Sequence, residues 1–223
     1  MILFNELSWY EQCNYKMEYF IKEIEYLKQK DVLNMYDQIR INTLLNIIKS
    51  PMEYATFALT QTVGKQKNAY IPFRKPYMDD KNYKKEINKK FGYVDETIFN
   101  IYNKLFESDV YEQFNDMHNN EKHTSINDHV EYISENTGVM NLPGNINIGN
   151  NTIKRPKDGE SKGVVLYGEE LDLTQNKGYS YDEEIYFEYN NREVFEFLDE
   201  VFNLVNNFVV DIKEYIDNKE RRM

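Results

Sequence analysis

The sequence predicts a mainly α protein, a helical bundle with a small inserted antiparallel β-section (α+β) before a long C-terminal helix. Three observations predict this class. Residues 8–136 hold apolar side chains at helical spacing between capping signals, residues 138–190 turn to short strand-like runs, and residues 191–217 return to one helical stripe. Because so wide a stripe must be buried against other helices, we expect a single domain over 1–223, with the β-section as an excursion from its helical core.

Two helices are predicted at the start of the chain. The letters SWYE at residues 8–11 form a capping box, whose hydroxyl and carboxylate satisfy orphan N–H groups, so the first helix should run to about Gln29. Asp31 is placed to cap a second helix, whose apolar period continues to Lys49. The next letters, SPMEYATFAL, put Pro51 after an N-cap serine, so either a third helix starts there or the second one kinks.

The segment after this helical stretch is predicted to be extended. Gly64 marks the end of the helix, since glycine is favoured just past a helix C-terminus. Residues 65–80, with the short apolar run AYIPF, are expected to cross the helical surface, because Pro72 and Pro76 disfavour a helix.

Shorter helices are predicted next. A basic helix covers 81–90, another begins near Asp95, and the letters DVYE at 109–112 form a further capping box. The histidine-rich letters DMHNNEKH then fall at the end of that helix or just beyond it. Residues 125–134 are expected to form one more short helix.

The strand-like section is rich in Val, Ile, Tyr and Phe. Residues 145–156 predict a strand, a Gly/Asn turn and a strand, and two more strand candidates lie within 163–173 and 183–190. The final helix, opened by residues 190–193, has the strongest periodic signal in the chain. Its apolar stripe comprises Val194, Phe197, Leu198, Val201, Phe202, Leu204, Val205, Phe208, Val209, Ile212 and Tyr215.

Composition excludes several classes of function. The net charge of −11 and the pI near 4.9 oppose contact with phosphate backbones, so non-specific binding to duplex DNA is not expected. Cys13 is the only thiol, so disulfides and thiolate metal clusters cannot form within the chain, which suits a reducing cytoplasm. Because the sequence shows neither a secretory signal nor a membrane-spanning run, we expect a cytoplasmic protein without membrane contact.

Three histidines fall close together, at His118, His123 and His129. Two histidines on a helix hold one metal ion comfortably at a spacing of four, whereas the spacings here are five and six. On a helix these spacings rotate the side chains by about 140° and about 240°, which turns His123 away from both neighbours. We therefore expect no metal site and no cofactor.

Asp116, Asn119, Asn120 and His123 share one helical stripe, because His123 lies seven, four and three residues after the other members. An acid on this stripe can orient the imidazole for acid–base chemistry, and an amide can hold a ligand oxygen. The alternative is structural, since a histidine near a helix end commonly bonds a backbone carbonyl or the negative end of the helix dipole. The residues alone leave both interpretations open.

The order of elements resembles that of the HEPN superfamily of prokaryotic helical proteins. The resemblance comprises the all-helical start, the PMEYATFAL helix, the YIPF crossing, a helix ending in NNEKH, the β-rich excursion and the long terminal apolar helix. It covers most of the chain as an order of elements, and its one compact motif is the segment Lys122-His123. The resemblance implies a dimeric helical bundle with a metal-independent RNase site, formed in active members by an arginine, a polar residue and a histidine.

The resemblance can be carried over residue by residue. His123 matches the family histidine as the acid–base group, Asn119 matches the polar residue, and His118 stands at one of the positions allowed for the arginine. The expected substrate-binding residues are Lys122, Asn120 and Asp116. The missing arginine is a departure from the family pattern, because a neutral histidine replaces a permanent planar cation that grips phosphate.

These observations give two functional hypotheses. The first is a HEPN-like homodimer in RNA-related or phage-defence work, either a metal-independent RNA endonuclease or a degenerate member that binds, inhibits or scaffolds. The second is a non-catalytic interaction module whose exposed strand edges and acidic surface bind a protein partner, for example a basic one. Metal-assisted hydrolysis is a third and weaker hypothesis, and the sequence leaves open whether the chain is an enzyme.

Overall fold

The computed structural model divides the chain into two compact units. The helical unit comprises Met1–Asn127 and Phe195–Met223, and the strand unit comprises Asp128–Val194. The strand unit therefore begins about ten residues before the expected position. The residues that the structure describes are 6–30, 32–64, 70–142, 146–149, 151–157, 164–166 and 169–221.

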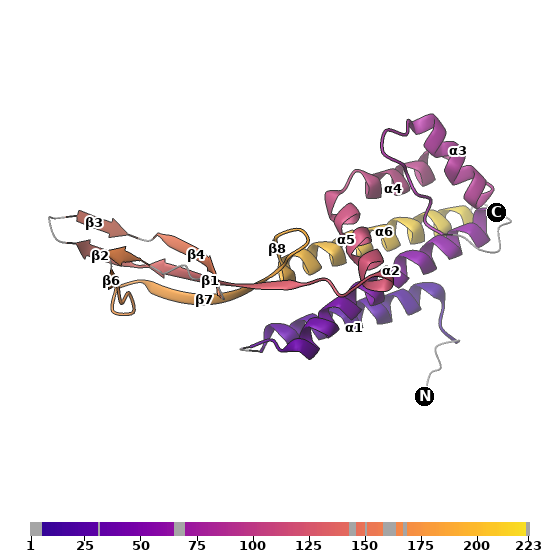
Figure 1. Cartoon of the computed structure of the whole chain (residues 1–223). Helices are drawn as coiled ribbons and strands as arrows, with labels where there is room; N and C mark the ends of the chain where they lie inside the picture. The colour runs from indigo at the N-terminus through magenta and orange to yellow at the C-terminus, as the bar shows by residue number, and fades with distance from the viewer. Residues whose placement is uncertain are drawn as a thin grey trace. The chain divides into compact units, whose positions relative to one another are not determined.

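The element order confirms the predicted class, mainly α with an α+β insertion before a long last helix (Figure 1). Three helices are much longer than the rest, with 20 residues in α1, 29 in α2 and 27 in α6. The described helices are α1 (Trp9–Lys28), α2 (Met35–Val63), α3 (Asp80–Phe91), α4 (Glu96–Phe106), α5 (Asp109–His123) and α6 (Val194–Glu220).

The first helix starts at the predicted capping box. Ser8 Oγ accepts a hydrogen bond from the Glu11 N–H at 3.3 Å, and the Glu11 carboxylate accepts from the Ser8 N–H at 2.8 Å. The helix ends at Lys28 with Gln29 as its C-cap, as expected. Its buried side chains recur at helical spacing and are Cys13, Met17, Phe20, Ile24 and Leu27.

The second helix is continuous, and its start differs from the prediction. Asn34 is the N-cap and accepts from two N–H groups, whereas Asp31 lies outside the described residues. No new helix begins at Ser50, because Pro51 lies inside α2 and is itself buried. Burial of apolar side chains on both sides of Pro51 outweighs the one backbone hydrogen bond that proline cannot donate. The predicted end is confirmed, with Gly64 donating its N–H to the Thr60 carbonyl at 2.9 Å.

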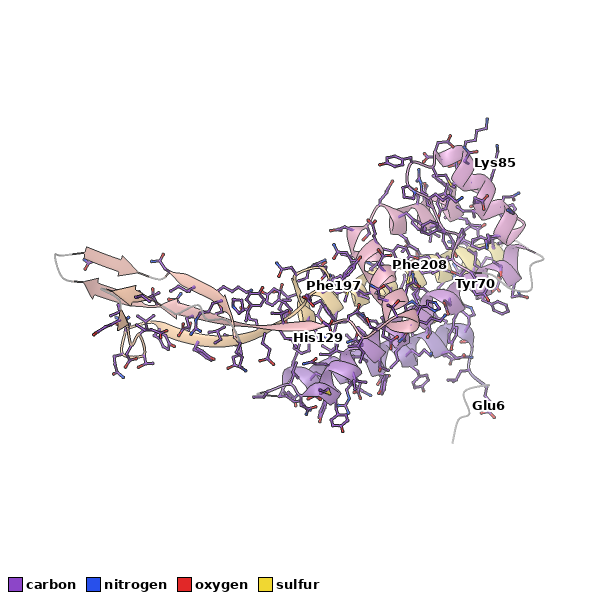
Figure 2. The ribbon with its side chains drawn as sticks, in the orientation of Figure 1. Glu6, Tyr70, Lys85, His129, Phe197 and Phe208 are labelled. Atoms are coloured by element: carbon purple, nitrogen blue, oxygen red, sulfur yellow. The ribbon has the colours of Figure 1, made fainter. Side chains whose placement is uncertain are left out.

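The last helix returns to the core, as its apolar stripe predicts. Phe197 and Phe208, labelled in Figure 2, are both buried members of this stripe on α6. The Phe202 ring stacks with Phe20 of α1 at a centroid distance of 6.2 Å, and Phe208 meets Tyr102 of α4 edge-on at 5.4 Å. The fully or nearly fully buried residues of α6 are Val194, Phe197, Leu198, Val201, Val205, Phe208, Val209, Ile212, Tyr215 and Ile216.

The shorter helices follow the predicted order with one change at a cap. Residues 70–75 form neither a helix nor a strand, and residues 65–69 of the predicted crossing lie outside the described residues. Asp79 caps α3 and Asp95 caps α4. The capping box expected at 109–112 is wrong, because the N-cap of α5 is Ser108, whose side chain accepts from the Tyr111 N–H.

The strand unit contains a four-stranded antiparallel sheet in the order β4-β1-β7-β8. Its strands are β4 (Thr152–Pro156), β1 (His129–Thr137), β7 (Tyr179–Phe187) and β8 (Arg192–Glu193). Two small hairpins accompany it: β2 (Val139–Leu142) pairs with β3 (Ile146–Gly149), and β5 (Val165–Leu166) pairs with β6 (Glu169–Glu170).

One local prediction for this section is wrong. The short helix expected at 125–134 is absent, because residues 129–137 form β1 and pair along their whole length with β7. This pairing joins distant residues, which local patterns do not encode. The two strands expected within 145–156 are confirmed as β3 and β4; β3 pairs with β2, and β4 pairs with β1.

Ion pairs join strands on both faces of the four-stranded sheet, and two of them reach across the central strand β1. On one face Lys157 contacts Glu131 at 2.9 Å and Glu183 at 2.7 Å. On the other face Lys154 contacts Glu184 at 2.6 Å and lies over the Tyr186 ring, 3.7 Å from its centroid. Such cross-strand pairs supply stability where few apolar side chains are buried.

A buried pair of side-chain amides, Asn42 and Asn127, joins α2 to the last residue of the helical unit before the strands. Asn42 Oδ1 of α2 accepts from the Asn127 backbone N–H at 2.9 Å and from Asn127 Nδ2 at 2.7 Å. Asn42 Nδ2 donates to the Asn127 carbonyl at 3.2 Å, and Asn127 Nδ2 also donates to the Met117 carbonyl at 3.1 Å. These bonds fix the chain beyond α5 against α2 without leaving the two side-chain amides unpaired.

We expect Gly64→Ala to destabilise the protein by about 2 to 3 kcal/mol. A Cβ atom at this position would lie 1.7 Å from the Phe91 carbonyl oxygen, so backbone must move. Urea unfolding measures the loss. Gly149→Ala is the matched control, because its Cβ would meet only Val139 at 4.0 Å, and an equal loss in both variants would contradict the argument.

Replacement of the buried amide in Asn42→Ala should cost about 2 to 3 kcal/mol of unfolding free energy, because Asn127 is left with buried unpaired groups. Thermal or urea unfolding of Thr43→Ala provides the comparison. Thr43 is exposed, and its hydroxyl bonds only the Ile39 carbonyl, so its loss should stay within about 0.5 kcal/mol.

Candidate functional site

Helix α5 separates an apolar buried face from a polar exposed face. Tyr111, Phe114 and Met117 are buried at spacings of three along the helix. The five predicted polar residues of this helix all lie on the exposed side; they are Asp116, Asn119, Asn120, Lys122 and His123. The structure therefore places the predicted stripe in contact with solvent.

His123 is the last residue of α5, followed by Thr124 as C-cap. Its side chain is exposed, and among the described residues it has no hydrogen bond or ion pair. The imidazole is thus free to meet a ligand, and no described neighbour orients it.

His118 lies in a different environment on the same helix. Its ring is half-buried and lies 6.5 Å from the Phe114 ring, measured between centroids. Its Nδ1 atom is buried and has no hydrogen-bond partner among the described residues. Burial lowers the pKa of His118, the charge of Lys49 lowers it further, and a hydrogen bond with Asn119 partly opposes both effects. The neutral imidazole is therefore favoured at pH 7.

Lys49 of α2 is a buried cation packed against α5. Its Nζ donates to Asn115 Oδ1 at 2.9 Å and to the Tyr111 hydroxyl at 3.4 Å. The ammonium also lies over the rings of Tyr111 and Phe114, at 4.7 and 5.3 Å from their centroids. Burial lowers the pKa of Lys49 to about 8, with the charge of Glu53 opposing this shift, so the ammonium remains mostly charged at pH 7.

The sequence reasoning missed Lys49, although a signal was present. Lys49 follows the letters LLNII and lies four residues after Leu45, a buried position of the α2 stripe. A charged residue at an apolar position of a helical stripe indicates a buried cation. The pattern could not reveal that the amine would meet α5, because that contact joins residues 62 and 66 positions apart.

Together these side chains define what we call the α2–α5 site, composed of Lys49, Asn115, His118, Asn119 and His123. It places a charged amine beside a half-buried neutral imidazole, which can accept a proton, and adds a second, exposed imidazole on the same helix. Asn46 of α2 also bonds the carboxylate of Glu121, so α2 and α5 are tied on either side of Lys49.

His129 belongs to the strand unit and makes different contacts (Figure 2). Its ring packs on Phe187 at a centroid distance of 5.0 Å, and both ring nitrogens are buried without a partner among the described residues. Burial lowers the pKa of His129 to about 4, so the ring is neutral at pH 7. Among the described residues, no three His, Cys, Asp or Glu side chains are grouped as a metal site would require.

A charged hollow of the helical unit, between α4 and α6, contains none of the predicted site residues. It has a volume of about 360 Å³. Several of its groups are paired within the protein, since Lys104 contacts Asp211 at 3.1 Å and the Tyr215 hydroxyl donates to Asp95 at 2.7 Å.

Comparison with protein family models, with curated protein sequences and with solved structures found no match. The HEPN-like resemblance accordingly rests on the order of elements alone. None of the helices within the described residues combines the length and the apolar character needed to cross a membrane.

The buried ring of His129 should make stability depend on pH. Its pKa is about 4 in the folded chain against a usual 6.5, so its contribution is complete above pH 6.5 and is lost as the pH falls towards 4. The loss is on the order of 3 kcal/mol. His129→Phe keeps the ring packing and should lose less stability than the wild type between pH 7 and pH 4 in urea unfolding. His123→Ala, which removes an exposed ring, should follow the wild type; identical curves for all three proteins would refute the assignment.

Proposed function

We propose that the helical unit is a HEPN-like, metal-independent ribonuclease that uses the α2–α5 site. One observation carries this proposal: a half-buried imidazole, His118, is kept neutral beside a buried lysine that retains its charge. In the family pattern an arginine supplies the cation. The α5 sequence has no arginine, and Lys49 of the neighbouring helix directs its positive charge at His118 instead of at the phosphate.

The proposed reaction uses the 2′-OH of the substrate as nucleophile. Neutral His118 accepts the 2′-OH proton while this oxygen attacks the adjacent phosphorus, and the bond to the 5′ oxygen breaks. His123 lies five residues further along α5 and gives the departing oxygen its proton through an intervening water, so the products are a 2′,3′-cyclic phosphate and a free 5′-OH. Asn119 positions the substrate, and Lys122 offsets the phosphate charge from the exposed side, with Asn120 and Asp116 as further contacts.

Lys49 acts through His118 in this scheme, because its buried amine has no route to the substrate. It is a positioning residue, which keeps the imidazole unprotonated and holds α5 through Asn115. The homodimer and the phage-defence role implied by the same resemblance belong to this proposal, as does the cytoplasmic location expected from the single thiol and the lack of a signal.

The test is cleavage of a single-stranded RNA in excess EDTA. We expect wild-type activity to survive chelation and to fall by about 100-fold or more in His118→Ala and in His123→Ala. His129→Phe is the control for loss of a histidine outside the helical unit and should keep full activity. Cleavage that persists in both α5 variants, or that disappears with EDTA, would overturn the proposal.

A second variant separates the electrostatic role of Lys49 from its packing. Lys49→Met keeps the length of the side chain and removes the charge that lowers the pKa of His118. The acidic limb of the pH–rate profile should therefore move to higher pH. Lys85→Met removes an exposed charge that points away from α3 (Figure 2) and should leave the profile unchanged.

A second candidate function, an interaction module without catalysis, is favoured by the strand unit. Among the described residues, β7 pairs with β8 only at Tyr186 and Phe187, which leaves one edge of residues 179–185 without a strand partner. Open strand edges bind extended peptides. This function uses a different unit of the chain from the α2–α5 site, so the two candidates can be tested separately.

A further inference from the structure

The open edge of β7 is long compared with the strand that covers its end. Nine residues of β7 pair with β1, whereas two pair with β8 on the opposite side. Within the part of the chain that the structure describes, alternate N–H and C=O groups of residues 180–185 therefore face outward without a strand partner, whereas the Tyr179 N–H bonds the Asn176 carbonyl. A partner strand could satisfy these groups in register.

The edge and the unit that carries it are acidic. The letters DEE at 182–184 lie in the middle of the open edge. Between residues 128 and 194 the sequence holds thirteen acidic and six basic residues, a net charge of −7 out of −11 for the chain. Glu183 and Glu184 are each paired with a lysine of the same unit, whereas Asp182 is exposed and no described residue pairs with it.

The opposite edge of the sheet has the reverse character. The five residues of β4 include Lys154 and Arg155, and Pro156 at its end cannot donate a backbone hydrogen bond. Its cations are already used, since Lys154 pairs with Glu184 and Arg155 with Glu135. The acidic edge is therefore both the longer edge and the one with an unpaired charge.

We infer that the open edge of β7 binds an extended peptide segment rich in lysine and arginine, by adding it to the sheet as an antiparallel or parallel strand. Backbone hydrogen bonds would give affinity, and a basic side chain beside Asp182 would give selectivity. This inference rests on the second candidate function and is independent of RNA cleavage.

A second copy of this chain fits the same edge less well. Antiparallel pairing of two β7 strands about their middle would set Glu183 against Glu183 and Asp182 against Glu184. Like charges directly opposite each other on paired strands are destabilising. Acidic side chains also discourage uncontrolled edge pairing, so a partner with the opposite charge is the one that relieves the repulsion.

The experiment measures binding of synthetic strand peptides to the full-length protein by isothermal titration calorimetry at low salt. The basic peptide alternates lysine with valine or threonine. Two matched peptides replace lysine by glutamate or by glutamine, and a fourth keeps the lysines but carries N-methyl groups on alternate backbone amides. The basic peptide should bind, while the glutamate and N-methylated peptides should not.

Two protein variants locate the contact. Asp182→Lys should weaken binding of the basic peptide by about fivefold, because one attractive charge pair becomes repulsive. Glu169→Lys makes the same change of charge on β6, in a separate two-stranded sheet, and should stay within about twofold of the wild type. An Asp182→Lys protein that binds as tightly as Glu169→Lys would overturn the assignment to β7.

The outcomes distinguish this inference from the function on which it rests. If the glutamine peptide binds as tightly as the basic one, strand addition stands and the basic partner is wrong. If none of the peptides binds, both the inference and the interaction module are wrong. If the N-methylated peptide binds as tightly as the basic one, charge attraction acts without strand addition, and the inference is overturned. The inference is also overturned if the protein self-associates with rising concentration and Asp182→Lys abolishes this, because the edge then binds a second copy.

Discussion

The side-chain amide of Asn42 determines where the helical unit ends, and the placement of the α5 residues depends on it. Its oxygen accepts two hydrogen bonds from Asn127 and its nitrogen donates one back, so the chain that leaves α5 is held against α2. The Asn46–Glu121 and Lys49–Asn115 hydrogen bonds add to it, so several polar contacts keep α5 beside α2. A buried amide pair fixes one relative orientation of the two residues. The reason is that an amide group buried without a hydrogen bond destabilises the fold by more than an apolar contact stabilises it.

The interface between α2 and α5 also buries the charge of Lys49, which lowers the stability of the fold. Lys49 is buried without an acidic partner in contact among the described residues, and its ammonium is satisfied by an amide, a hydroxyl and two aromatic rings. Buried cations of this kind are expensive to desolvate, and they are concentrated at functional sites. The charge of Lys49 adds to burial in lowering the pKa of the half-buried His118, which makes this part of α5 chemically different from its exposed end at His123.

The two units achieve stability by different means. The helical unit buries long apolar stripes, with α6 in contact with α1 and α4 through aromatic rings. The four-stranded sheet uses cross-strand ion pairs on both faces and keeps its two edges opposite in charge. An acidic surface of this kind disfavours nucleic acid and favours basic polypeptide. The two proposed functions use different units, with acid–base chemistry proposed for the helices and recognition proposed for the strands.

The sequence by itself determined the long helices, the caps at Ser8 and Gly64 and the return of the last helix, because helical periodicity and capping are local and repeat every few residues. It also placed Asn119, Lys122 and His123 on one polar helix. Tertiary structure alone decided that α2 runs through Pro51, that residues 129–137 form a strand, and that Lys49 meets α5. These features depend on contacts between residues far apart in the chain. Burial and strand pairing there override the secondary structure or exposure that the local sequence favours.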